Sequence, residues 1–163
     1  GHSPDHACLY CPALQLVIAG DQILPRITPN VSVFPTEPDG NPLEAWLASS
    51  TRLLGMLPED LLVLPAHQSP FTGVRLRLNQ IIDSHRLALA NLYDLLMEPK
   101  LLPECFGCLF GREIGDGEIQ MATGETVAHL NYLLHRGNIT RRVNAEDRYE
   151  YQSDPEARYI DAE

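Results

Sequence analysis

Three side chains suited to metal binding lie in turns or directly after apolar runs in the first half of the chain. His2 follows the N-terminal glycine, Asp21 follows the run Leu-Val-Ile-Ala-Gly, and His67 follows Leu-Val-Leu-Pro-Ala. Imidazole and carboxylate groups together suit zinc, iron or manganese. The three donors therefore indicate a metal site, although a catalytic site needs more ligands than these three.

The elements that must position these donors alternate between strands and helices. Strands are predicted over 6–10 and 15–19, and the second is expected to be buried on both faces because it is almost continuously apolar. Asn41-Pro42 opens a helix, and residues 61–64 form a short buried strand. Asp21 then lies at the carboxyl end of a strand, the edge at which layered α/β proteins place their ligands.

A proline-rich loop over residues 22–41 connects the second strand to this helix. Long loops are usually functional when they lie beside a site. Arg26, Thr28 and Asn30 are its polar candidates for contacting a substrate. A surface connector stiffened by proline is the alternative interpretation.

The second half of the chain is predicted to be helical and to end in a β-hairpin. One helix runs from about 74 to 97, and another, capped by Thr123, runs from about 124 to 135. Strands over 139–143 and 148–152 follow. Helical segments followed by a hairpin form a winged-helix pattern. The expected division has three parts: residues 1–73, 74–152 and an acidic tail, 153–163.

Composition excludes several classes of protein. Hydrophobic residues make up 44% and charged residues 21%, as in globular proteins, and no apolar run is long enough to predict a membrane span. The net charge of −10 disfavours nucleic acid and anionic membranes as partners. Two Cys-x-x-Cys pairs, Cys8/Cys11 and Cys105/Cys108, are too far apart for a zinc ribbon. Free thiols in a reducing cytoplasm are the simpler expectation, and a shared zinc site is the alternative.

The donor motifs resemble the last three motifs of the metallo-β-lactamase-fold hydrolases. Gly-His-Ser-Pro-Asp-His at residues 1–6, Gly20-Asp21 and Pro65-Ala66-His67 come in the family's order. The helical segment and its hairpin are similar to the lactamase-β-like subgroup. The resemblance implies an α/β (α+β) fold, namely the C-terminal half of an αββα sandwich followed by a winged-helix-like domain.

The resemblance also implies roles for individual residues. His2 would complete the ligands of a first zinc ion, Asp21 would bridge two ions and thereby act in catalysis, and His67 would bind the second ion. The ion pair would supply hydroxide for attack at neutral pH, with iron or manganese left open in place of zinc. His6 matches a position that supports the ligands from a second layer of contacts, with a structural or a catalytic role left open. Asp5 would be a turn residue or an acceptor in that second layer.

The family's His-x-His-x-Asp-His motif is absent from this sequence. We therefore expect a C-terminal fragment that is inactive alone. Its parent would be a cytoplasmic hydrolase of a thioester, lactone or related ester that uses metal-bound hydroxide. A metal-dependent nuclease of the same fold and a non-enzymatic interaction module are the alternatives.

The predicted hairpin bears on the nuclease alternative. Arg136, Arg141, Arg142 and Arg148 gather there, but the preceding helix has no basic stripe. Phosphate binding usually needs a concentrated basic face. A small-molecule ester or thioester is thus the expected partner, and the helical domain is a candidate surface for a homodimer.

Overall fold

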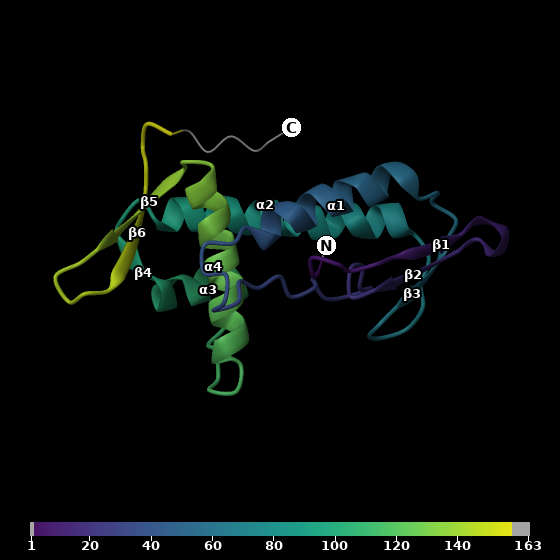
Figure 1. Ribbon diagram of the computed structural model, residues 1–163, viewed down its shortest axis with the longest axis horizontal. Helices are drawn as coiled ribbons and strands as arrows, with labels where there is room; N and C mark the ends of the chain where they lie inside the picture. Colours follow the sequence, from purple (N-terminus) through teal and green to yellow (C-terminus); the bar gives the residue numbers. More distant parts are fainter. Residues whose placement is uncertain (1, 158–163) are drawn as a thin grey trace. The chain divides into compact units, whose positions relative to one another are not determined.

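The apolar run before Asp21 forms the central strand of a three-stranded sheet in the computed structural model of the protein, which describes residues 2–157 (Figure 1). This strand, β2 (Leu16–Gly20), pairs antiparallel with β1 (Leu9–Cys11) and parallel with β3 (Leu62–Pro65). Because β2 and β3 are parallel, their carboxyl ends meet at one edge of the sheet. The turns that follow the two strands are therefore neighbours.

The two faces of this sheet differ in exposure. Val17 and Ala19 of β2 are fully buried, whereas Ile18 between them is 46% exposed. Leu9 of β1 and Leu62 of β3 are exposed as well, at 62% and 42%. The expectation that β2 is buried on both faces is wrong, because the side chains at alternate positions remain in contact with solvent.

The described residues form two compact units. Unit 1 comprises residues 1–31 and 44–84, and unit 2 comprises residues 32–43 and 85–163, as far as these are described. The division expected from the sequence, with boundaries after residues 73 and 152, stays a prediction. Gly1 of the opening motif and the last six residues of the expected acidic tail, 158–163, lie outside the described residues.

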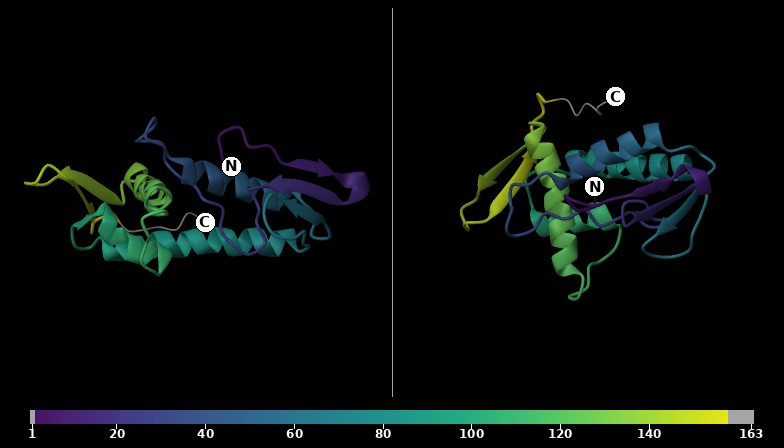
Figure 2. Two further views of the ribbon diagram at one scale, coloured as in Figure 1. Left: turned by 90° about the horizontal axis from the view of Figure 1, so that it is seen from below. Right: turned by 45° about the vertical axis from the view of Figure 1, so that its right-hand side comes forward.

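Two helices contribute to unit 1. α1 (Pro42–Met56) begins at the predicted Asn-Pro pair and buries Trp46 completely. α2 (Val74–Leu95) has its first part in this unit, where it lies beside α1 (Figures 1 and 2). The Arg75 guanidinium of α2 donates a hydrogen bond of 2.6 Å to the Leu54 carbonyl of α1. A 3₁₀ turn, η1 (Pro12–Leu14), joins β1 to β2.

Unit 2 combines the rest of α2 with two further helices and a second sheet. The helices are α3 (Phe106–Phe110) and α4 (Ile119–His135), and a 3₁₀ turn, η2 (Leu102–Cys105), precedes α3. The sheet has the order β4-β6-β5 with antiparallel pairing throughout. Its strands are β4 (Lys100–Leu101), β5 (Ile139–Val143) and β6 (Tyr149–Ser153).

The sequence pattern located most of unit 2. The strand over 139–143 is confirmed, and its partner is displaced by one residue from the predicted 148–152. The predicted start of α4 is wrong, because the helix begins at Ile119 and Thr123 lies inside it. Among the residues that the structure describes, no helix is long and apolar enough to cross a membrane.

Two buried histidines lie in the core of unit 2. His129 Nδ1 is 2.8 Å from the Glu125 carbonyl, which can only accept, so Nδ1 carries the proton. His129 Nε2 then accepts a hydrogen bond from His85 Nδ1 at 3.2 Å. Burial, together with the neighbouring His129, lowers the pKa of His85 to about 3, and burial lowers the pKa of His129. Both rings are therefore neutral and structural at pH 7.

Candidate metal site

Asp21 and His67 lie against each other at the carboxyl edge of the unit 1 sheet. His67 Nε2 is 3.2 Å from Asp21 Oδ1. The Ala66 amide donates to the Gly20 carbonyl at 3.0 Å, which extends the pairing of β2 with β3 to the residues next to both side chains. The structure thus brings together two of the three ligands predicted from the sequence.

His2 is held in a fixed orientation by backbone and side-chain contacts. Its amide donates to Gln22 Oε1 at 2.8 Å, and its ring Nδ1 lies 2.9 Å from the Asn30 carbonyl. Since that carbonyl can only accept, Nδ1 carries a proton, and in the neutral ring the lone pair lies on Nε2. Metal-binding histidines typically show this arrangement, in which the second ring nitrogen donates to a fixed acceptor.

Gln22 supports His2 from within unit 1, and the sequence interpretation missed it. Its side chain is 2% exposed, and its amide donates to Ser50 Oγ at 2.9 Å and to Ser49 Oγ at 3.2 Å on α1. The signal was present in the sequence, because a polar residue follows the Gly-Asp pair directly and precedes Ile-Leu. Gln22 therefore connects helix α1 to the segment that carries His2.

His6 packs over the turn that carries Asp21. Its Nε2 donates to the Ala19 carbonyl at 3.0 Å, and its ring is 5.9 Å from the ring of His2. Gly20 adopts φ +54°, and a Cβ added there would lie only 2.7 Å from His6 Cε1. The positive φ and the close approach both require glycine. His6 thus shapes the turn at Gly20, the last residue of β2, directly before Asp21.

The remaining candidates have different environments. Asp5 is exposed and lies in a turn, which is closed by a hydrogen bond of 3.1 Å from the His6 backbone amide to the Ser3 carbonyl. The Asp5 side chain has no hydrogen-bond or ion-pair partner among the described residues. Asn30 contributes its backbone carbonyl to His2. Arg26 is exposed and lies on a pocket.

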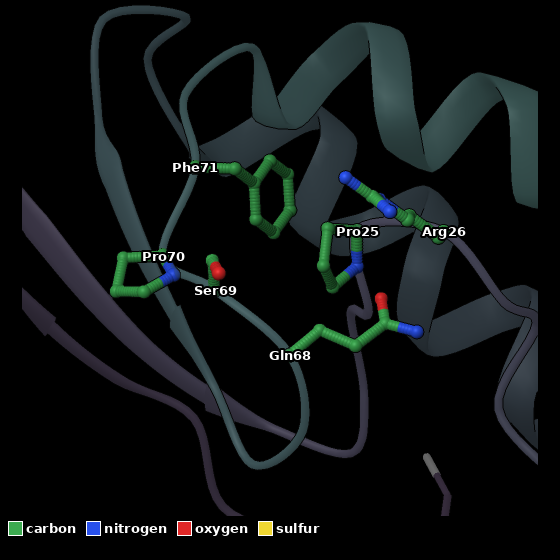
Figure 3. Close-up of a pocket in the computed structure, with 6 residues that line it drawn as sticks. All are labelled: Pro25, Arg26, Gln68, Ser69, Pro70 and Phe71. Carbon is green, nitrogen blue, oxygen red and sulfur yellow. The ribbon is translucent and has the colours of Figure 1, made fainter.

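That pocket has a volume of about 360 Å³ and lies in the loops that follow β2 and β3 (Figure 3). The residues lining it are Pro25, Arg26, Gln68, Ser69, Pro70 and Phe71. Gln68, which comes directly after His67, has φ +68°. A side-chain-bearing residue in the left-handed region is uncommon and is found mainly where a tight turn or a functional site demands it.

The donor set fits part of a metal site. His2 Nε2, the Asp21 carboxylate and His67 are the ligand types that zinc takes in proteins. Within residues 2–157, however, no three His, Cys, Asp or Glu side chains are grouped closely enough to hold a metal ion. A complete site would need donors beyond these.

The four cysteines are free thiols, and burial raises the pKa of Cys8 and of Cys105.

Known structures and families agree with this fold. Residues 89–154 match the family model described as metallo-beta-lactamase-like, C-terminal domain. A beta-lactamase domain protein from Burkholderia ambifaria is 36% identical, with a TM-score of 0.89 over 94% of this chain. A metallo-beta-lactamase family protein from Thermus thermophilus is 30% identical, with a TM-score of 0.80 over 94% of this chain. No curated protein sequence matches.

These similarities define a mixed α/β chain with the metallo-β-lactamase fold, as the three donor motifs predicted. The chain spans about half of the two solved structures, 46% and 47% of their lengths.

Proposed function

We propose that the protein containing this chain is a metal-dependent hydrolase of a thioester, a lactone or a related ester. The observation that carries the proposal is the contact between Asp21 and His67 at the edge of a metallo-β-lactamase-fold sheet. His2, with its Nε2 lone pair available, is the third donor. Together these side chains would hold zinc, or iron or manganese, which the same donor types also suit.

The chain's own residues would prepare this site in three ways. The Asn30 carbonyl and Gln22 fix the orientation of His2. Gly20 and His6 shape the turn that presents Asp21. When bound, the metal would lower the pKa of a water molecule and polarise the ester carbonyl. Because the described residues supply only part of the ligand set, we expect the chain to be inactive alone.

The test is hydrolysis by the full native protein of three substrates: a phenyl ester, a phenyl thioester and a lactone. Asp21→Asn keeps the size of the side chain but weakens metal binding, so we expect turnover to fall at least about a hundredfold. Asp60→Asn changes an exposed carboxylate in the same unit and should leave turnover unchanged. Full turnover in the Asp21→Asn protein would disprove the proposed role of this carboxylate.

We further propose that residues 74–152, most of which lie in unit 2, form a winged-helix-like domain. Its element order, with β4 between α2 and α3 and the β5–β6 hairpin after α4, supports this interpretation. A structural or dimer-forming role suits it better than nucleic-acid binding. Three arginines of the hairpin region are paired with acids, Arg141 with Asp39, Arg142 with Glu150 and Arg148 with Glu146.

A nuclease of the same fold is the alternative function. It predicts that short RNA or DNA binds at low salt and is released as salt increases. Our proposal predicts no binding under those conditions.

We also propose that the protein is cytoplasmic, which its four free thiols support.

A further inference from the structure

We propose that the pocket formed by residues 25–26 and 68–71 binds an anionic oxygen group of the substrate, a carboxylate or a phosphate, through Arg26. This inference rests on the proposed hydrolase function and specifies its substrate class. The ligand would be an acyl compound that carries an oxyanion some distance from the bond that is hydrolysed.

The shape and chemistry of the pocket are those of a small polar subsite. In Figure 3 the Pro25 ring lies between the Phe71 ring and the Arg26 side chain, and the Gln68 side chain lies below Pro25. The two rings provide apolar walls. The guanidinium, the Gln68 amide and the Ser69 hydroxyl provide hydrogen-bond donors. A few placed polar groups beside apolar walls are typical of ligand pockets.

The charge of Arg26 is not paired within the described part of the chain. Among residues 2–157, its side chain has no hydrogen-bond or ion-pair partner. It is also one of two basic residues in positions 1–73, which contain seven acids. Planar guanidinium groups bind carboxylate and phosphate in a bidentate manner. An unpaired arginine in an acidic part of the chain is therefore available to an external anion.

The loop that carries Arg26 is fixed by a second arginine. Arg77 of α2 donates from Nε to the Leu24 carbonyl at 2.6 Å and from Nη2 to the Ile27 carbonyl at 2.9 Å. These two bonds lie on either side of Pro25 and Arg26 along the chain. A loop that only connects two elements does not require such a clamp. A binding loop benefits from it, because preorganisation lowers the entropic cost of holding a ligand.

The opposite wall is equally well anchored and is continuous with the candidate metal site. Val63 and Phe71 exchange two backbone hydrogen bonds, of 2.8 and 3.1 Å, which close the loop that contains His67. The positive φ of Gln68 turns the chain directly after His67. The proposal requires that a substrate held at Asp21 and His67 reach the pocket with its distal end.

The test compares two substrates that differ only in whether the distal carboxyl group is free or methylated. Monophenyl glutarate carries a free carboxylate, and its methyl ester is neutral. In the full native protein, Arg26→Gln should raise KM for the charged substrate about tenfold, the worth of one charge-assisted hydrogen bond. The neutral substrate should be unaffected. Arg52→Gln, which removes the other basic residue of positions 1–73, should change neither KM.

Equal effects of Arg26→Gln on both substrates, or no effect on either, would overturn the proposal. If the protein hydrolyses neither substrate, the hydrolase proposal fails, and the subsite is tested by binding. Glutarate or methyl phosphate is then titrated while the Arg26 Nε–H resonance is followed by NMR, and the anion that shifts it identifies the preferred group. If neither anion shifts this resonance, the anion site does not exist.

Arg77 is a positioning residue in this account. Arg77→Lys keeps the charge but cannot reach both carbonyls in the same geometry. It should raise KM for monophenyl glutarate while kcat stays unchanged, and the neutral ester should not respond. A fall in kcat for both substrates would instead indicate general damage to unit 1.

Discussion

Two pairs of histidines, one in each unit, have opposite environments. In unit 2, His85 and His129 are buried, bonded to each other and neutral. In unit 1, His2 is half-buried and His67 is exposed, and His67 contacts the carboxylate of Asp21. The same residue type thus completes a core in one unit and lines an edge in the other. Environment, not residue type, distinguishes a candidate ligand from a structural histidine.

The sheets of the two units differ in where their exposed apolar side chains lie. Unit 1 leaves Leu9, Ile18 and Leu62 exposed across one sheet face, whereas unit 2 buries Ile139 and Tyr151 and leaves Val143 and Tyr149 exposed at the turn end of its hairpin. Three arginines of the hairpin region in unit 2 are paired with acids, whereas Arg26 of unit 1 has no such partner among the described residues.

The largest expected effect is on the core of unit 2. Leu133 of α4 is fully buried, so Leu133→Ala should lower the free energy of unfolding by about 3 kcal/mol through lost burial and a cavity. Leu9→Ala removes a side chain that is 62% exposed and should cost less than about 0.5 kcal/mol. Urea unfolding of both variants provides the measurement. Similar losses would show that the sheet face around Leu9 is covered in solution.

Gly20→Ala should be the most damaging small change in unit 1. The new methyl group would meet the His6 ring, and φ +54° is unfavourable for alanine. We expect a loss of about 2–3 kcal/mol in unfolding free energy. Gly55→Ala, at a position where an added Cβ meets nothing within 4 Å, is the matched control and should not destabilise the protein. A stable Gly20→Ala variant would mean that His6 does not pack over this turn.

Acid should destabilise the protein through the histidines of unit 2. The pKa of His85 is about 3 in the folded protein and about 6.5 in an unfolded chain, so the unfolded state binds more protons between these values. The contribution of neutral His85 to the free energy of unfolding is therefore fully present above pH 6.5 and is lost as the pH falls toward 3. At pH 5, this effect of His85 alone should lower the free energy of unfolding by about 2 kcal/mol relative to neutral pH.

His85→Gln provides the control for this pH dependence. Glutamine can still donate a hydrogen bond toward His129 but does not take up a proton. Unfolding of this variant and of the unchanged protein should be compared at pH 7.5 and pH 5. An equal loss of stability on acidification in both would exclude His85 as the origin.

The smallest expected effect is at Gln68. Glycine tolerates φ +68° better than glutamine, but it also increases the entropy of the unfolded chain. Gln68→Gly should therefore change the unfolding free energy by less than about 0.5 kcal/mol. Gln68→Val should lose about 1–2 kcal/mol, because a β-branched residue fits this region poorly. Differential scanning calorimetry of the two variants would separate these outcomes, and equal stabilities would contradict the account.

Much of the fold was predictable because local sequence patterns determine it. Asn41-Pro42 marked the start of α1, and the apolar run before Asp21 marked β2. The closeness of Asp21 and His67 was implied by the resemblance of the donor motifs, and the parallel pairing of β2 with β3 explains it. The exposure of Ile18 was not predictable, because a continuous apolar run indicates only that a strand could be buried on both faces.

Other features depend on contacts between distant residues. The start of α4 was misplaced because Thr123 has the chemistry of a cap, yet the helix continues through it to Ile119. The bonds from Gln22 to α1 and from Arg77 to the Leu24 and Ile27 carbonyls join residues that no local pattern relates. The placement of the candidate ligands was therefore easier to predict than the contacts that orient them.

The most direct test of the central claim is the metal content of the full native protein, measured by mass spectrometry after purification without added chelator. We predict that the unchanged protein and the Asp60→Asn control contain zinc, iron or manganese. Asp21→Asn and His67→Asn should lose most of this metal, because each removes a donor from the pair at the sheet edge. Undiminished metal in both Asp21→Asn and His67→Asn would contradict the account.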